Sequence, residues 1–249
     1  AIGLVGSEMC IRDRVNTLND GDNVLMVETG HFASLWNNMA QKLGLKVELL
    51  KTDWRQGLDP NEIEKRLRLD IDKKIKAVCI VHNETSTGCT SDVKVVREIL
   101  DNLNHDALLM VDTISGLASM NYEHDEWGVD ITISGSQKGL MLPPGLSFNA
   151  ISEKAINASK KSTLKKSYWD WDEHLEFNRT GFFPYTPATN LLFGLKEAIE
   201  MLHEEGLTNV FKRHARYSKA TRIAVNAWGL EVYCQNEKRF SDVLTAVLV

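Results

Sequence analysis

The sequence predicts an α/β fold whose mainly parallel sheet is flanked by helices and is followed by the start of a smaller C-terminal α/β lobe. Three observations support this prediction. Short apolar, β-branched runs alternate with amphipathic helical patterns between residues 23 and 151. Several of these runs are apolar throughout, as expected for strands that are buried on both faces. Two long helical patterns follow, and after them the chain turns back toward strand.

Six strands are expected in the first part of the chain, at Asn23–Glu28, Leu45–Leu50, Lys76–Val81, Ala107–Asp112, Asp130–Ser134 and Leu146–Ile151. Helices are expected between and after them, at Ala33–Leu43, Pro60–Leu67, Asp92–Leu103, Thr189–Glu204 and Leu207–Trp228. Asp59 before Pro60 is a typical helix start, because an N-cap acceptor precedes a proline at the first helical position. Residues 152–179 are rich in lysine and aromatic residues and show no clear period.

The two ends of the chain differ from the patterned middle. The segment Glu8–Arg14 breaks the apolar periodicity, so we expect residues 1–14 to be foreign to the fold. We expect a large domain over residues 15–215 and the beginning of an incomplete small domain over residues 216–249. Leu244–Val249 is expected to form a strand with nothing after it to pair with, so we expect a chain truncated at both ends.

Composition excludes several classes of protein. The 249 residues include 29 Lys and Arg against 34 Asp and Glu, and the resulting net charge of -5 argues against a nucleic-acid partner. The longest apolar runs are far shorter than a membrane span. The four cysteines show no CxxC pair and no metal-ligand spacing with histidine, so we expect neither a disulfide framework nor a metal site. We therefore expect a cytoplasmic protein.

Two chemically suggestive side chains follow neighbouring strands. Asp112 ends one apolar strand, and Lys138 comes just after the next, between small residues. Alone, the aspartate could cap a loop and the lysine could be a solvated surface residue. Together they suit pyridoxal 5′-phosphate, because an amine can react with its aldehyde while a carboxylate keeps its ring nitrogen protonated. Ligands of open α/β sheets collect beyond the carboxyl ends of the strands, where both residues are expected.

Two further clusters also lie at expected strand ends. The hydroxyls of His82–Gly88, HNETSTG, could bind a cofactor or substrate, or could form a serine- and threonine-rich turn. Phe32 in Thr29–Phe32, TGHF, could stack on a planar ring, or could be a core residue that begins a helix.

From Val15 to Val249 the chain resembles the class V aminotransferases of pyridoxal-phosphate fold type I, in the branch that contains the alanine–glyoxylate and serine–glyoxylate transaminases. The segments that carry the resemblance are HNETSTG, VDTISG, SGSQKGLMLPPGLSF, SYWDWDEHLEFN and GFFPYTPATNLLFGLKEAIEML. The resemblance implies the large domain of that fold, pyridoxal phosphate as cofactor, amino acid and 2-oxo acid substrates, and a homodimer. It implies transfer of an amino group, with L-serine as the expected donor, to glyoxylate, giving hydroxypyruvate and glycine.

The resemblance also assigns residues around the cofactor ring. It implies that Lys138 binds the cofactor aldehyde and then moves a proton of the substrate, and that Asp112 pairs with the ring nitrogen. Phe32 and Ile114 are expected on opposite faces of the ring.

Three more residues are expected to contact polar groups of the cofactor. The resemblance implies that Thr85 donates a hydrogen bond to the 3′-oxygen and that Gln137 contacts the phosphate. It implies that Thr186 reaches the phosphate in the neighbouring subunit, which requires a dimer.

The sequence departs from the family pattern in two places. The phosphate-binding turn of the family is expected just before Val15, where Arg12–Arg14 are charged instead, so phosphate binding is not assigned to that segment. The arginine that binds the substrate carboxylate is expected beyond Val249, so this chain by itself is expected to be weakly active or inactive.

Two alternative functional hypotheses remain: alanine–glyoxylate transamination, and an inactive chain that keeps the fold. A cysteine desulfurase is disfavoured because Cys79 and Cys89 flank the HNETSTG turn and do not lie on a separate loop. A nucleotide-binding Rossmann protein is disfavoured because no GxGxxG follows the first strand.

Overall fold

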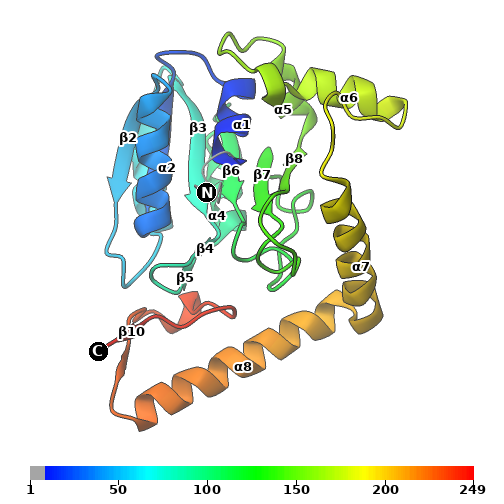
Figure 1. Cartoon of the computed structure of the whole chain (residues 1–249). Helices are drawn as coiled ribbons and strands as arrows, with labels where there is room; N and C mark the ends of the chain where they lie inside the picture. Colours follow the sequence, from blue (N-terminus) through cyan, green and yellow to red (C-terminus); the bar gives the residue numbers. More distant parts are fainter. Residues whose placement is uncertain (1–8) are drawn as a thin grey trace.

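A six-stranded sheet forms the centre of the computed structural model, which describes residues 9–249 (Figure 1). The strands lie in the order β2-β1-β3-β6-β7-β8. The first five are parallel to their neighbours, and only β8 runs antiparallel, against β7. Their bounds are β1 Asn23–Glu28, β2 Lys46–Lys51, β3 Ile75–Val81, β6 Leu108–Asp112, β7 Ile131–Gly135 and β8 Ser147–Ile151.

The predicted fold class is confirmed, and each of the six predicted strands agrees with an observed one to within one residue at either end. The agreement has a simple cause. Every residue of β6 and β7 is buried, so both strands read as uninterrupted apolar or small-residue runs. The edge strand β8 is only partly buried. Two short hairpins accompany the sheet, β4 Asn83–Glu84 with β5 Cys89–Thr90 and β9 Glu231–Val232 with β10 Val247–Leu248.

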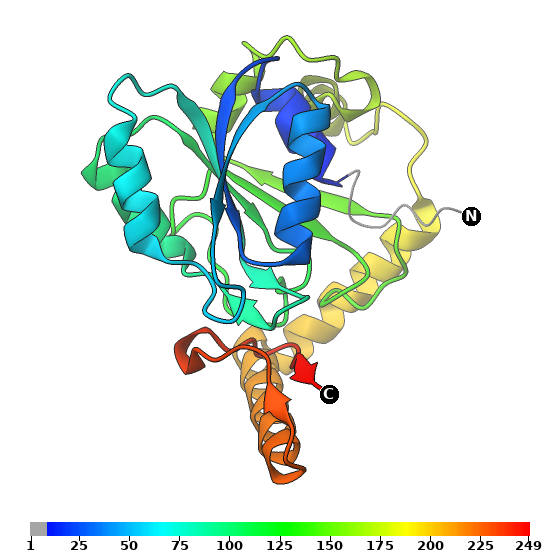
Figure 2. The same ribbon diagram turned by 90° about the vertical axis from the view of Figure 1, so that its left-hand side faces the viewer.

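Helices cover both faces of the sheet, and Figure 2 shows the sheet between the two groups. One face is covered by α1 Met9–Thr17, α2 His31–Lys42 and α5 Glu153–Ser159. The other is covered by α3 Pro60–Leu69 and α4 Val93–Asn102. The predicted cap of α3 is present, since Asp59 accepts a hydrogen bond from the backbone N–H of Asn61 at 3.0 Å.

Residues 152–179 contain structure that the sequence analysis missed. They form α5, the 3₁₀ turn Ser167–Trp169, and α6 Trp171–Arg179. Trp171 is the one buried residue of α6, and its indole N–H donates to Asn149 Oδ1 at 3.2 Å. With a single buried side chain the helix has no apolar period for a sequence pattern to reveal.

Helix α1 includes part of the segment that we expect to be foreign to the fold. Residues 1–8 lie outside the described residues, whereas residues 9–14 form most of α1, which packs against the sheet. The guanidinium of Arg14 is buried, donates to the carbonyl of Trp36 at 3.0 Å, and lies 4.5 Å from the centre of the Trp36 ring. The carboxylate of Asp13 is also buried, and neither oxygen has a hydrogen-bond partner among the described residues. Charged side chains thus occupy a helix face that packs on an apolar core.

Beyond the sheet, α7 Thr189–Glu205 and α8 Leu207–Ala227 lead away from it, and the last residues return beneath β4 and β5 (Figure 1). The boundary that we place between residues 215 and 216 lies inside α8. The strand expected at Leu244–Val249 is shorter than predicted, because only Val247–Leu248 form a strand, which pairs with the preceding β9. Just before this segment, the backbone N–H of Ser241 donates to Gly88 O, beside the β4–β5 hairpin, at 2.9 Å.

Among residues 9–249, no helix combines the length and the apolar character needed to cross a membrane.

The buried carboxyl of Asp13 predicts a pH dependence of stability. Burial raises its pKa from 3.8 to about 7 in the folded chain. The folded state therefore binds more protons than the unfolded state between these values, and the free energy of unfolding falls as the pH rises through this window. Asp13→Asn removes this titration and should raise the free energy of unfolding at pH 8 by roughly 2–4 kcal/mol relative to the natural residue. Urea denaturation of both chains at a series of pH values measures this difference in the free energy of unfolding.

The matched control is Asp106→Asn, because the Asp106 side chain is exposed and takes part in no ion pair or hydrogen bond among the described residues. This variant should leave the pH dependence unchanged. An Asp13→Asn chain with the pH slope of the parent chain would show that the Asp13 carboxyl is not buried as described.

Candidate functional site

The candidate site lies beyond the carboxyl ends of β6 and β7. Asp112 is the last residue of β6 and pairs in register with Ile133 of β7, and Lys138 follows β7 by three residues. The backbone N–H of Thr113 donates to Ile133 O at 2.8 Å, so the pairing continues to the very end of β6. Asp112 and Lys138 line the same cavity, which has a volume of about 450 Å³.

Six of the seven predicted site residues line this cavity: Phe32, Thr85, Asp112, Ile114, Gln137 and Lys138. They come from four separate segments of the chain, namely the start of α2, the β4–β5 hairpin, the end of β6 and the loop after β7. The seventh, Thr186, lies in an exposed hollow formed by residues 181–187, outside the cavity. The structure thus gathers the predicted residues at one place, with Thr186 as the exception.

Asp112 is buried at the floor of the cavity. Its Oδ1 accepts a hydrogen bond from the backbone N–H of Ile114 at 2.8 Å. Burial and, to a smaller extent, the negative charge of Glu84 raise the pKa of the Asp112 carboxyl to about 7, against the lowering effects of the Ile114 N–H and of Arg14. A carboxylate in such a place is strongly stabilised by a cationic ligand group.

Several polar atoms in the cavity wall have no partner. Both the oxygen and the nitrogen of the Gln137 amide are buried without a hydrogen bond among the described residues, and so is Asn83 Oδ1. Asn83 Nδ2 donates to Ser115 Oγ at 2.9 Å, and that hydroxyl donates to the carbonyl of Asn83 at 2.7 Å. Because buried polar groups are normally satisfied, the free amide of Gln137 indicates a polar ligand. Asn83 and Ser115 are cavity residues that the sequence analysis did not single out.

Lys138 is exposed at the mouth of the cavity. A dry site would help the Lys138 amine to lose its proton and react with an aldehyde. Within this chain the site is not dry, because the turn after β7 carries Lys138 beyond the sheet. The turn itself is well fixed, since Met141 N donates to Lys138 O at 2.9 Å. A Cβ atom at Gly139 would lie 2.1 Å from the carbonyl oxygen of Leu117, so only glycine fits at this close approach.

Phe32 lies in the first turn of α2, and 43% of it is exposed. The alternative of a core phenylalanine is therefore wrong. Its ring forms part of the cavity wall together with the side chains of Leu35 and Met39 from later turns of α2. This wall is apolar, which suits the flat face of an aromatic ligand.

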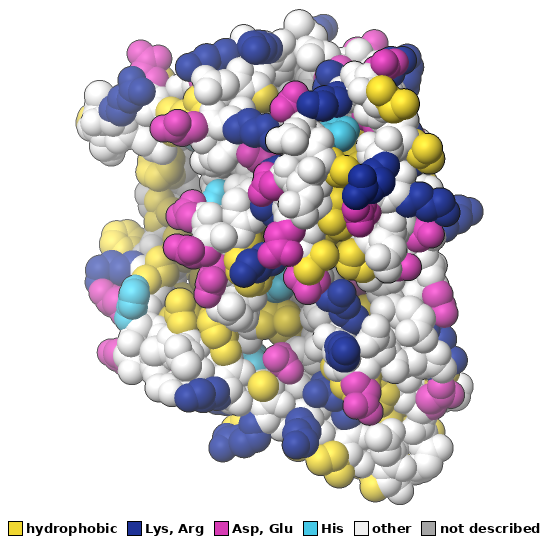
Figure 3. All heavy atoms as spheres, turned by 180° about the vertical axis from the view of Figure 1, so that it is seen from behind, with side chains coloured by type: hydrophobic (Ala, Val, Ile, Leu, Met, Phe, Trp, Pro, Cys, Tyr) yellow, Lys and Arg dark blue, Asp and Glu magenta, His cyan; other side chains and the backbone are white. Residues whose placement is uncertain are grey.

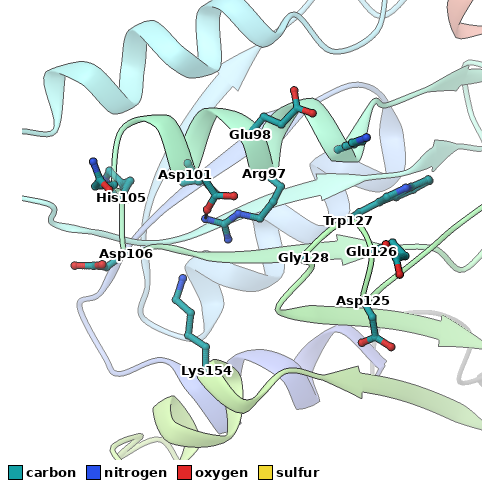
Figure 4. A pocket seen from close by; sticks show the side chains of 13 residues that line it. Arg97, Glu98, Asp101, His105, Asp106, Asp125, Glu126, Trp127, Gly128 and Lys154 are labelled. Carbon is teal, nitrogen blue, oxygen red and sulfur yellow. Dashed lines mark ion pairs between the residues drawn. The ribbon is translucent and has the colours of Figure 1, made fainter.

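A larger hollow of about 790 Å³ is lined by α4, by residues 125–128 and by Lys154 (Figure 4). Two of its basic side chains form ion pairs. Arg97 contacts Asp101 at 2.6 Å and Asp130 at 3.6 Å, and Lys154 contacts Asp130 at 3.5 Å. The face seen in Figure 3 carries positive and negative side chains interspersed, without a large field of one sign. We interpret this hollow as a surface groove crossed by structural ion pairs.

Among the described residues no group of three or more His, Cys, Asp or Glu side chains is arranged to hold a metal ion.

Comparisons with known proteins agree with this geometry. The chain is 44% identical to the serine–glyoxylate aminotransferase of Arabidopsis thaliana and 48% identical to that of Methylorubrum extorquens, each over 94% of this chain. It spans about 59% of the length of these relatives. It is also 42% identical to the L-aspartate–glyoxylate aminotransferase of Paracoccus denitrificans, over 94% of this chain and 59% of that relative.

Solved structures show the same fold. The pyridoxamine–pyruvate aminotransferase of Mesorhizobium loti superimposes with a TM-score of 0.88 at 25% identity, over 98% of this chain and 62% of that one. The subgroup IV aspartate aminotransferase of Thermus thermophilus superimposes with a TM-score of 0.85 at 26% identity, over 98% of this chain and 66% of that one. The family model described as aminotransferase class-V matches residues 7–247. The chain therefore belongs to the class V aminotransferase family.

Proposed function

We propose that the protein is a pyridoxal-phosphate-dependent aminotransferase that transfers the amino group of L-serine to glyoxylate, giving hydroxypyruvate and glycine. One observation carries the proposal: Asp112 and Lys138, from the ends of neighbouring parallel strands, line one cavity. The choice of substrates is supported by the relatives named serine–glyoxylate aminotransferase, at 44% and 48% identity.

The chemistry of the cavity fits this cofactor. When bound, pyridoxal phosphate supplies an electron-withdrawing ring that stabilises negative charge at the substrate Cα. Asp112 would hold the proton on the ring nitrogen, and the positive charge of that nitrogen would stabilise the carboxylate, whose pKa is raised mainly by burial. Nζ of Lys138 would bind the aldehyde and, once released by the substrate amine, would take the proton from the substrate Cα and deliver it to the C4′ carbon of the cofactor.

The remaining wall residues would orient the ring. Phe32 and Ile114 would exclude water from its two faces. The Thr85 hydroxyl would donate to the 3′-oxygen, and the unpartnered amide of Gln137 would contact the phosphate.

The active unit is proposed to be a homodimer. Thr186 lies outside the cavity of its own chain, in a segment whose aromatic side chains are exposed: 67% of Phe182, 45% of Phe183 and 43% of Tyr185. Exposed aromatic clusters of this kind are typical of protein interfaces. In a dimer this segment would bring Thr186 to the phosphate of the neighbouring subunit and would cover the exposed Lys138. The large domain is proposed to span residues 15–215 and the small domain to begin at residue 216.

We also propose a cytoplasmic location. Its support is that Cys79, Cys89 and Cys234 are free thiols.

The first experiment is a titration with pyridoxal phosphate followed by visible absorbance. The parent chain should develop a visible band that Lys138→Ala abolishes, whereas Lys42→Ala, at the other lysine that lines the cavity, should keep it. Lys65→Ala is the matched control, since Lys65 is exposed on α3 and its variant should keep the band. Bleaching by L-serine and recovery with glyoxylate would show transamination, and L-alanine and L-aspartate test the other donors. A parent chain without a band would contradict the proposal.

A second experiment tests the carboxylate. Asp112→Asn cannot hold the ring-nitrogen proton by charge, so the Kd for pyridoxal phosphate should rise on the order of 10- to 100-fold. The same variant should be more stable than the parent without cofactor at pH 8, because it no longer buries an uncompensated carboxylate. Asp101→Asn is the control for the Kd, since Asp101 is exposed and is not one of the residues that line the cavity. An unchanged Kd for Asp112→Asn would remove this residue from the site.

A further inference from the structure

Helix α2, which carries Phe32, has an unusual N-terminus. The residue before it is Gly30, which has no side chain to accept from the free N–H groups of the first turn. These N–H groups instead donate hydrogen bonds to residues more than 50 positions away in the sequence. Ser86 Oγ accepts from His31 N at 2.9 Å, and the two carboxylate oxygens of Glu84 accept from Phe32 N at 3.4 Å and from Ala33 N at 3.1 Å. The β4–β5 hairpin thus caps α2 in place of a neighbouring residue.

Glu84 is completely buried, and no Lys or Arg pairs with it among the described residues. Besides the two helix amides, its Oε1 accepts from Ser86 N at 3.0 Å and from Ser86 Oγ at 2.7 Å. A carboxylate only accepts hydrogen bonds, so all four donors suit it. The helix N-terminus adds a favourable partial positive charge. The N-terminus of α2 is therefore already occupied by an acidic side chain of the same chain.

Gly30 makes room for this contact. A Cβ atom at this position would lie 2.4 Å from Glu84 Cγ and 2.5 Å from Ser86 Oγ. Any larger residue would push the Glu84 carboxylate away from the helix end. The contact therefore depends on two distant positions, a glycine before α2 and a glutamate in the hairpin.

The contact joins two walls of the cavity. Phe32, whose backbone N–H bonds Glu84, lies on one wall, and Thr85, the next residue after Glu84, lies on another. We infer that Glu84 is a positioning residue, which fixes the first turn of α2 against the β4–β5 hairpin and so sets the place of the Phe32 ring relative to Thr85. The contact between Glu84 and the first turn of α2 is observed in this chain. Only the identity of the ring that Phe32 would face rests on the proposed function.

The test compares Glu84→Ala, Glu84→Gln and Asp59→Ala. Glu84→Ala removes the cap, whereas Glu84→Gln keeps one oxygen that can accept. Asp59→Ala is a matched control, because it removes a natural N-cap from α3, away from the cavity. Where Glu84→Ala does not fold, Gly30→Ala takes its place, since it displaces the carboxylate without removing it.

Two readouts are used. The first is amide hydrogen exchange of residues 31–34 without cofactor, which should become at least about fivefold faster in Glu84→Ala, less so in Glu84→Gln, and unchanged in Asp59→Ala. The second is the visible circular dichroism of bound pyridoxal phosphate at saturation, which reports how the ring is held. It should fall by about half or more in Glu84→Ala, recover partly in Glu84→Gln, and stay at the parent value in Asp59→Ala.

Unchanged exchange in Glu84→Ala would overturn the inference, and so would a loss of circular dichroism in Asp59→Ala as large as that in Glu84→Ala. If the parent chain binds no pyridoxal phosphate, the proposed function fails. The exchange measurement still decides whether Glu84 clamps α2.

Discussion

The parallel pairing of β6 with β7 is the constraint on which the site depends. Because both strands run the same way and pair in register up to Asp112 and Ile133, their carboxyl ends meet at one edge of the sheet. The loops that follow must then leave the sheet side by side, which brings Lys138 and Asp112 to one cavity. Burial on both faces holds this register, since a shift by one residue would turn every side chain to the opposite face.

Three carboxyl groups in and around the cavity are buried, and they differ in their hydrogen-bond partners. Glu84 is satisfied by backbone N–H groups and a hydroxyl. Asp112 accepts from one backbone N–H, and burial raises the pKa of its carboxyl to about 7. Asp13 has no partner among the described residues. The buried carboxyl of Glu84 therefore stabilises the fold, that of Asp112 is proposed to bind a ligand, and that of Asp13 has no evident role.

Much of the fold could be predicted because its signals are local. Continuous apolar runs identified β6 and β7, and Asp59 before Pro60 identified the start of α3. Helix α6 was missed because Trp171 is its one buried residue. The C-terminal strand was wrongly extended, because an apolar run resembles a strand even where only two of its residues pair.

The lining of the candidate cavity could be predicted where a residue type is informative by itself or through the family resemblance, as with Lys138 and Asp112. Glu84 could not be found in this way, because its partners are backbone N–H groups more than 50 residues away and leave no pattern in the sequence. Asn83 and Ser115 were missed for a similar reason, since each is informative only once the hairpin lies beside the loop after β6. Thr186 lies outside the cavity of its own chain, and the expectation that it serves a neighbouring subunit stays a prediction.

The most direct test of the central claim is to find where the cofactor attaches. The chain is incubated with pyridoxal phosphate, reduced with borohydride, digested and analysed by mass spectrometry. The account predicts that the label is on the peptide that contains Lys138 and that it is lost when Asp112 is replaced by asparagine at limiting cofactor. A label spread over surface lysines such as Lys160, Lys161, Lys165 and Lys166, with Lys138 unmodified, would contradict it.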